Sequence, residues 1–145
     1  MGDMNAYVYK TTDFGQTWTS LVTPDLQGFA RNIQEDYVNE NLLFLGTEFG
    51  LFITLDGGKS WAKFTNNMPA ASVHFIELHK KSNDLIVATH GRGIMIIDDI
   101  SPLRQLTEEA MNKELHFFTM RPTIIDEASG FGTTSTETQF IGENP

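Results

Sequence analysis

Apolar positions along this chain gather in short runs that are separated by glycine, asparagine, aspartate and proline. The runs stand at 31–38, 42–46, 51–55, 59–64, 73–80, 85–89 and 94–98. The first of them alternates in part between apolar and polar residues, whereas 42–46 and 85–89 are almost uninterrupted. Runs of this length bounded by turn residues are typical of β-strands. The pattern therefore predicts an all-β chain of short antiparallel strands.

A motif of the form T-x-D-x-G-x-[ST]-W occurs twice, 43 residues apart. Its members are Thr11, Asp13, Gly15, Thr17 and Trp18 in the first copy, and Thr54, Asp56, Gly58, Ser60 and Trp61 in the second. At the same offset, Arg31–Asp56 aligns without a gap to His74–Asp99, which is a third and weaker copy. Four strands in about 40–45 residues is the size of a β-propeller blade. The repeat predicts a partial β-propeller of two to three four-stranded antiparallel blades.

The blades are expected at fixed places in the chain. We assign residues 1–100 to the propeller, with the tail of one blade at 5–22, a whole blade at 30–65 and most of a third at 73–100. Known propellers hold four to eight blades, so a closed ring needs at least ~170 residues at this period. We therefore expect the sequence to be the C-terminal part of a longer propeller, whose remaining blades are its partners.

The motif resembles the Asp-box, or BNR repeat, of sialidases, sortilin-type receptors, xyloglucanase-type glycoside hydrolases and photosystem assembly factors. The stretch 85–104 is similar to the last propeller blade of large bacterial proteins labelled sortilin-like or glycosyl hydrolase. The ending, 140–145, is similar to the start of the C-terminal β-domain that follows in that group. The resemblance runs from about Tyr7 to Pro145. It implies the fold and leaves the function open, because its hosts include enzymes and non-enzymes.

The residues of the Asp-box suit a tight turn between the third and fourth strands of a blade. Its aspartate can accept hydrogen bonds from turn N–H groups, and its glycine permits a positive φ. Its threonine adds a hydroxyl bond, and its tryptophan is expected to pack beside the turn. We interpret both copies as structural, with glycosidase carboxylates or a calcium site as the alternative.

Ligand-binding candidates lie in the loops at the opposite face of the blades, where the resemblance to sialidases implies the substrate. His90 and Arg92 between two glycines form the best group, with Thr89 beside them and Glu48 in the comparable loop one blade back. Arginine can hold a carboxylate or a sugar hydroxyl, and histidine can donate or accept nearby. The alternative is that Arg92 pairs with an acidic neighbour such as Glu48 and that His90 caps its turn.

Two pairs of adjacent acidic residues have plain structural explanations. Asp98 and Asp99 point to opposite sides of a strand, so they cannot face each other across a glycosidic bond. Asp99 is expected to cap a turn, and Glu35 and Asp36 are expected to be solvated. The sequence shows no spacing of metal ligands, and we expect neither a metal site nor a cofactor.

Residues 101–122 follow the repeats as a separate segment. Ser101-Pro102 and Thr107 offer helix starts, which predict a short helix within 102–113 that covers the closing edge of the propeller. An extended segment is expected at 115–120. Residues 123–145 are rich in glycine, serine, threonine and glutamate, which favours a flexible linker toward a further C-terminal domain.

Composition narrows the range of functions. Ten basic residues against 19 acidic ones give a net charge of -9, which disfavours nucleic-acid binding. The chain has no cysteine, which excludes disulfides and thiolate zinc sites, and no apolar run long enough to span a membrane. The first residues do not form a signal peptide, although the resemblance implies a secreted or periplasmic protein.

Three functions agree with these features. The first is a non-catalytic binding or scaffold segment of a sortilin-like propeller, with a protein, peptide or carbohydrate ligand. The second is a segment of a secreted glycoside hydrolase of the xyloglucanase or sialidase type, whose catalytic residues lie mostly outside this chain. The third is an assembly factor that holds another protein. Whether the parent protein is an enzyme is left open by the sequence.

Overall fold

The computed structural model describes residues 3, 5–120 and 122, which fold into nine strands and two single-turn helices. The elements are β1 (Tyr9–Lys10), β2 (Thr19–Ser20), β3 (Ala30–Glu35), β4 (Leu43–Thr47), β5 (Gly50–Thr54), β6 (Ala62–Lys63), β7 (Val73–His79), β8 (Asp84–Thr89), β9 (Ile94–Ile97), α1 (Ser101–Arg104) and α2 (Glu108–Met111).

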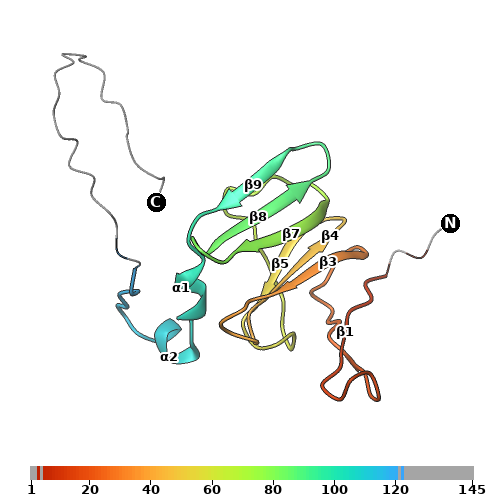
Figure 1. The fold of residues 1–145 in the computed structure, drawn as a ribbon, viewed down its shortest axis with the longest axis horizontal. Coiled ribbons are helices and arrows are strands. Elements are labelled where there is room, and N and C mark those ends of the chain that lie inside the picture. Colours follow the sequence, from red (N-terminus) through yellow and green to blue (C-terminus); the bar gives the residue numbers. More distant parts are fainter. Residues whose placement is uncertain (1–2, 4, 121, 123–145) are drawn as a thin grey trace, which may run out of the picture.

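The strands form three antiparallel sheets in chain order, which lie one after another (Figure 1). The first sheet pairs β1 with β2, the second has the order β3-β4-β5-β6, and the third has the order β7-β8-β9. Each strand pairs with its neighbour in sequence, as in the blades of a propeller. The predicted all-β partial propeller is confirmed.

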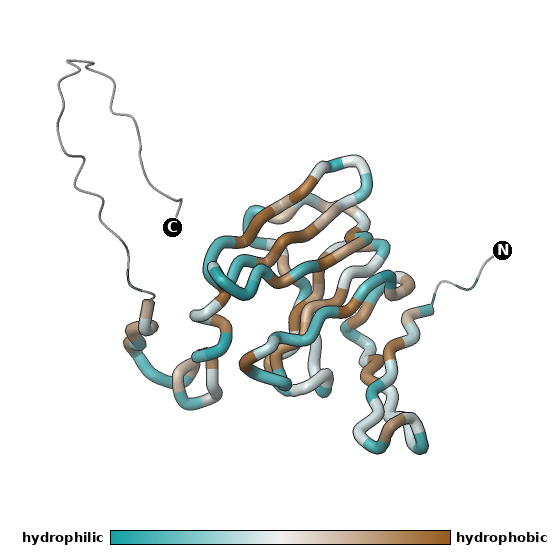
Figure 2. Tube along the Cα trace, viewed as in Figure 1, coloured by the Kyte–Doolittle hydropathy of each residue, from teal (hydrophilic) through white to brown (hydrophobic). Residues whose placement is uncertain are grey.

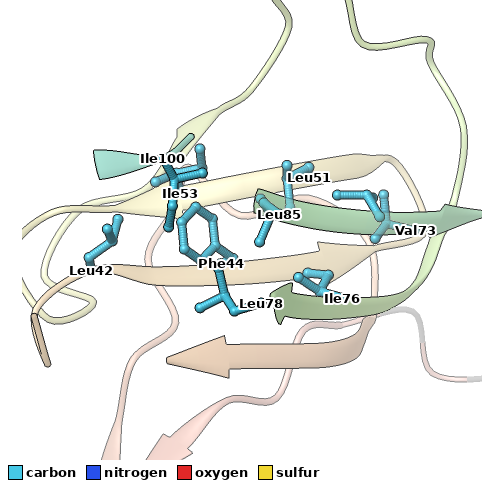
Figure 3. Close-up of a cluster of buried hydrophobic side chains, with 10 residues drawn as sticks. Leu42, Phe44, Leu51, Ile53, Val73, Ile76, Leu78, Leu85 and Ile100 are labelled. Carbon is cyan, nitrogen blue, oxygen red and sulfur yellow. The ribbon is translucent and has the colours of Figure 1, made fainter. Parts of the chain in front are cut away.

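The second sheet is buried on both faces. Figure 3 shows one of them, where Phe44 and Leu51 of the second sheet meet Leu85 and Val73 of the third. On its other face, Leu45, Phe52 and Trp61 pack against Val8 and Leu21, which flank the first sheet. Hydrophobic residues accordingly concentrate in the strands of the second and third sheets (Figure 2). Burial on both faces explains why the run 42–46 shows no apolar–polar alternation.

A glycine lets the second and third sheets come close. A Cβ on Gly46 would lie 2.6 Å from Cγ1 of Val73 and 2.9 Å from its carbonyl oxygen. Real Cβ atoms do not approach other atoms so closely, so any side chain at this position would force the sheets apart. Gly46 is therefore required by packing, and its backbone does not adopt a positive φ.

The third sheet shows that the gap-free repeat alignment is wrong by one residue in β8. Glu35 pairs with Leu43, and its repeat equivalent Leu78 pairs with Leu85, so Leu85 corresponds to Leu43 rather than to Leu42. The connection before β8 is one residue shorter than its counterpart in the second sheet, and the loop after β8 is one residue longer. Because a one-residue slip turns a side chain to the other face, Leu85 points back at the second sheet.

Asp36, which was expected to be solvated, is buried with only 2% of its surface exposed. Its two carboxylate oxygens accept hydrogen bonds from Nη2 and Nε of Arg104 at 2.8 and 3.0 Å. Backbone N–H groups of Val38 and Asn39 also donate to it, at 3.2 and 2.8 Å. The expectation was wrong because Arg104, the ionic partner of Asp36, lies on α1, 68 residues later in the chain. The guanidinium of Arg104 also lies 4.7 Å from the ring centroid of Tyr37. Glu35 is exposed as expected.

The expected helix within 102–113 forms as two separate turns, α1 and α2. Leu103 of α1 packs against the core between the second and third sheets, at the end of the strands rather than along the outer edge of β9 (Figure 1). The segment 115–120 is not part of a sheet, but the side-chain amide of Gln105 bonds both the N–H and the carbonyl of Thr119, at 2.8 and 2.9 Å. The expected linker at 123–145 lies outside the described residues.

Replacing the buried aspartate tests the ion pair with Arg104. In Asp36→Asn the guanidinium stays buried without its counter-charge, which we expect to lower the free energy of unfolding by about 3–5 kcal/mol. The neighbouring Glu35→Gln, at an exposed position, serves as the matched control and should change stability by less than about 0.5 kcal/mol. Urea unfolding followed by circular dichroism measures both. Equal, small effects of the two substitutions would contradict a stabilising pair.

Candidate functional site

The turn between β5 and β6 is organised by the carboxylate of Asp56. The hydroxyl of Thr54 donates to Oδ1 of Asp56 at 2.6 Å and accepts the N–H of Gly58 at 3.0 Å. Oδ1 also accepts the N–H groups of Lys59 and Ser60, at 2.9 and 3.0 Å. Oδ2 accepts the hydroxyl of Ser60 at 2.6 Å. Most of the polar groups of this turn thus bond one carboxylate or the threonine beside it, and the N–H of Gly57 bonds the carbonyl of Asn41 at 2.9 Å.

The turn between β1 and β2 repeats this network around Asp13. Thr11 donates to Oδ1 of Asp13 at 2.9 Å and accepts the N–H of Gly15 at 2.8 Å, and Thr17 donates its N–H and hydroxyl to Asp13 at 2.8 and 2.6 Å. The bonds from Thr17 hold the pKa of Asp13 at about 2. In the second turn partial burial would raise the pKa of Asp56, but the bonds from Ser60 and Thr54 outweigh it and lower it to about 2. Both carboxylates are therefore ionised at neutral pH and unsuited to act as general acids.

The two tryptophans of the repeated turns have different surroundings. Trp61 is 5% exposed, and its indole N–H donates to the carbonyl oxygen of Leu21 at 2.8 Å. Trp18 is 61% exposed, and its indole N–H donates to Gly15 of its own turn at 3.1 Å. Trp61 is buried because the first sheet lies beside it. In the described residues, no sheet lies beside Trp18 in the same way.

The four ligand-binding candidates lie at the other ends of the strands. Glu48 is in the loop between β4 and β5, and Thr89, His90 and Arg92 are at the loop between β8 and β9. The hydroxyl of Thr89 donates to the carbonyl of Gly93 at 2.7 Å and so joins the two ends of the loop. Thr47, its counterpart in the second sheet, does the same with Gly50 at 3.3 Å.

Glu48 is held by its own blade. Oε2 of Glu48 accepts Nη2 and Nε of Arg31 at 2.5 and 3.2 Å, and the hydroxyl of Ser72 at 3.2 Å. The bond from Arg31 is the main reason that the pKa of Glu48 lies below its ordinary value. Glu48 thus has Arg31 as its ionic partner, and not Arg92.

In the third sheet a pair of histidines takes the place of this ion pair. The rings of His74 and His90 stack with their centroids 5.2 Å apart and an angle of 22° between their planes. The N–H of His90 donates to the carbonyl of Ser72 at 2.8 Å. Arg92 is exposed at the loop tip, and the described part of the chain offers it no hydrogen bond or ion pair. The structure therefore brings Glu48 and His90 together around Ser72 and leaves Arg92 apart.

A groove of about 360 Å³ opens next to Glu48. It is lined by Gln27, Glu48, Phe49, Lys63, Ala70, Ala71 and Ser72. These residues come from the segment that joins the first and second sheets, from the loop between β4 and β5, from β6, and from the segment that joins the second and third sheets. Glu48 was a candidate from the sequence, whereas Lys63 was not, because it lies on a strand rather than in a loop.

Two glycines shape the groove. A Cβ on Gly28 would lie 2.8 Å from Cδ2 of Phe49 and 3.0 Å from Cβ of Glu48, and its φ of +76° is unfavourable for other residues. A Cβ on Gly50 would lie 3.2 Å from Cε of Lys63. The absence of side chains at Gly28 and Gly50 therefore leaves room for Phe49 and Lys63, which both line the groove.

The described part of the chain was also searched for clusters of metal-ligating side chains and for helices of membrane-spanning length. Within residues 3, 5–120 and 122 there is no group of three or more histidine, aspartate or glutamate side chains placed to hold a metal ion. None of the helices found there has the length and apolar character needed to cross a bilayer.

Comparison with known families gives a match over most of the chain. Residues 6–114 match the model of the family Sortilin-Vps10, described as "Sortilin, neurotensin receptor 3". The matched stretch includes all nine strands, both helices and both aspartate turns. No curated protein matches the chain.

The pH dependence of stability tests the role of the turn carboxylate. Because Asp56 has a lower pKa in the folded chain than its ordinary 3.8, its contribution is complete above about pH 4 and is lost as the pH falls toward 2. At pH 7 we expect Asp56→Asn to cost about 1–3 kcal/mol, since it removes charge-assisted bonds to the turn. The difference from the wild type should shrink between pH 4 and pH 2.

Urea unfolding across this pH range measures the effect of Asp56→Asn. Asp98→Asn, at an exposed position, is the control and should follow the wild-type curve at every pH. A difference between Asp56→Asn and the wild type that stays constant down to pH 2 would show that the charge of Asp56 does not stabilise the turn.

Proposed function

The chain belongs to the Sortilin-Vps10 family, and from this premise we propose that it is a binding segment of a sortilin-like propeller that holds an extended stretch of a protein ligand in the groove beside Glu48. The observation that carries the proposal is the groove itself, because four stretches of chain converge on it, namely the two segments that flank the second sheet, the loop between β4 and β5, and β6. The family is of the extracellular or luminal type, so we also propose that the parent protein is exported.

The lining of the groove suits a peptide with an apolar side chain next to an acidic group. Phe49, which is 50% exposed, lines the groove together with Ala70 and Ala71 and makes part of its surface apolar. The negative charge of Glu48 is already paired with Arg31. Lys63 makes no ion pair within the described residues, so its ammonium is available to a carboxylate of the ligand. Backbone groups of the peptide would bond Gln27 and Ser72.

The same lining argues against hydrolysis by this segment. A glycoside hydrolase needs two carboxyl groups that face each other across the bond to be cleaved. Of the residues found to line the groove, only Glu48 carries a carboxylate, and Arg31 holds it. Asp13 and Asp56 lie in turns at the other ends of the strands. The catalytic pair of a hydrolase would therefore have to come from other blades of the parent protein.

Selection from a random-peptide phage library tests the proposed ligand class. We expect enriched peptides to combine an aromatic or aliphatic residue with aspartate or glutamate. Lys63→Glu and Phe49→Ala should each weaken the binding of an enriched synthetic peptide at least about tenfold, since each removes a central contact. The control is Lys81→Glu, an exposed lysine in the turn between β7 and β8, which should change affinity less than twofold.

Binding to the same variants is measured by calorimetry, after circular dichroism has shown that they fold. A glycan array run in parallel distinguishes a carbohydrate ligand. Enrichment of no common motif, or peptide affinity that is unchanged in Lys63→Glu, would overturn the proposal. Glycan binding that is lost in Phe49→Ala, without peptide binding, would assign the groove to carbohydrate instead.

A further inference from the structure

The pairing of strands shows which residues at the loop ends correspond between the second and third sheets. Ala30 of β3 pairs with Thr47 of β4, and Val73 of β7 pairs with Thr89 of β8. Each of these four residues comes directly before a charged or titratable side chain. The corresponding side chains are therefore Arg31 with His74 and Glu48 with His90.

The pair in the second sheet is complete by itself. Oε2 of Glu48 accepts Nη2 and Nε of Arg31 at 2.5 and 3.2 Å. The hydroxyl of Ser72 donates to the same oxygen at 3.2 Å. The guanidinium of Arg31 also lies 4.5 Å from the ring centroid of Phe29. The positive charge in this blade therefore has its counter-charge within the chain and needs none from a ligand.

The pair in the third sheet lacks the negative member. His74 takes the place of the cation, and His90 takes the place of the carboxylate of Glu48. The two rings stack with their centroids 5.2 Å apart, and both side chains are exposed. Within the described residues neither ring takes part in an ion pair. Because histidine is the side chain that ordinarily gains a positive charge between pH 8 and pH 5, this pair can become a cation without a counter-charge of its own.

The elements around the histidines carry charged side chains of both signs. They are Arg31 of β3, Glu48 of the loop between β4 and β5, Glu77 in the middle of β7, and Arg92 of the loop between β8 and β9. The pKa of Glu48 is lowered first of all by the bond from Arg31 and, among smaller causes, by the charge of His74. Since Arg31 already holds Glu48, and Arg92 adds a positive charge to the loop of His90, an anion is favoured beside the histidines.

The histidine pair adjoins the groove beside Glu48. The backbone N–H of His90 donates to the carbonyl of Ser72 at 2.8 Å, and the hydroxyl of Ser72 donates to Glu48 at 3.2 Å. Ser72 and Glu48 both line the groove, whereas neither histidine is among the residues found to line it. A ligand that lies in the groove and extends past Ser72 therefore reaches the histidines.

We propose that His74 and His90 form a second subsite for the ligand of the groove, which takes a carboxylate when one of the two imidazoles is protonated. The proposal rests on the proposed function for the identity of the ligand as an acidic peptide. The chemical class follows from the blade before, where the carboxylate of Glu48 stands at the position of His90 and accepts the cation of Arg31. A carboxylate of the ligand takes the same role toward the imidazolium, through a charge-assisted hydrogen bond.

Binding at this subsite is linked to the uptake of a proton. A bound carboxylate stabilises the imidazolium relative to the neutral ring, so binding and protonation favour each other. We expect the affinity for a peptide with two acidic residues to rise about three- to tenfold from pH 8 to pH 6, an interval in which histidine ordinarily changes its charge and carboxylates do not. One acidic residue pairs with Lys63 of the groove, and the other with the histidines.

NMR of the four imidazoles in the 145-residue chain tests the subsite without any peptide. The probe is glutarate, added at constant ionic strength. It should shift the signals of His74 and His90 at pH 6 and leave them nearly unchanged at pH 8. His79, at the other end of β7, and His116 are internal controls that should not respond at either pH. No response at pH 6, an equal response at both pH values, or an equal response of all four histidines would overturn the subsite.

The variant His90→Glu supplies the missing anion from within the chain, in the arrangement that the second sheet already uses. We expect the response of His74 to glutarate at pH 6 to disappear. The affinity for a phage-selected peptide with two acidic residues should then change less than twofold between pH 8 and pH 6. His79→Gln, an exchange at an exposed position of the same strand, is the matched control and should keep both effects. Circular dichroism shows that both variants fold.

Calorimetry of the same peptide in two buffers of different ionisation enthalpy reports the proton taken up on binding. Peptide binding that is equal at pH 6 and pH 8, takes up no proton and is unchanged in His90→Glu would overturn the subsite and leave the groove as proposed. Absence of peptide binding at both pH values, with the glutarate response of His74 and His90 retained, would instead overturn the proposed function and leave a carboxylate subsite.

Discussion

The burial of the second sheet between two neighbours is the constraint on which the rest of the structure depends. Leu45, Phe52 and Trp61 face the first sheet, and Phe44 and Leu51 face the third. A two-stranded sheet is marginal alone, so the first sheet in particular is stabilised by the apolar surface that it shares with the second. Trp61 makes the contact specific, because its indole N–H, on the second sheet, donates to the carbonyl oxygen of Leu21, which flanks the first sheet. The carboxylate of Asp56 in turn shapes the turn that leads directly into Trp61.

This stacking determines where ligand chemistry is possible. Since the aspartate turns occupy one end of the strands and hold the sheets, the loops at the other end are free to differ between blades. Arg31 and Glu48 form an ion pair in the second sheet, and His74 and His90 stack at the equivalent positions of the third. Phe49 and Lys63 add an apolar wall and a cation. A common scaffold with loops that vary from blade to blade is what a binding propeller requires.

Most of the fold could be predicted from the sequence, because short strands and the repeated turn depend on residues that are neighbours in the chain. The features that the sequence did not predict depend on contacts between residues that are far apart in the chain. The slip in β8 was hidden because two loops change length by one residue in opposite directions. Asp36 was expected to be solvent-exposed because its ionic partner, Arg104, lies 68 residues away in the chain.

The candidate site was predicted only in outline. The face that carries the loops followed from the order of strands in a blade, and so did the positions of Glu48 and His90. Lys63 was missed, since a lysine on a short strand gives no sign of which groove it enters. The tryptophans share one motif, yet only Trp61 is buried, because burial depends on the neighbouring sheet and not on the motif. The most direct test of the account is therefore the hydrogen exchange of the two indole N–H groups, measured by NMR on the same sample. The stacked sheets predict that the N–H of Trp61 exchanges at least about 100-fold more slowly than that of Trp18, because it opens only when the sheets separate. Equal exchange rates for the two indoles would contradict the stacking of the first sheet on the second.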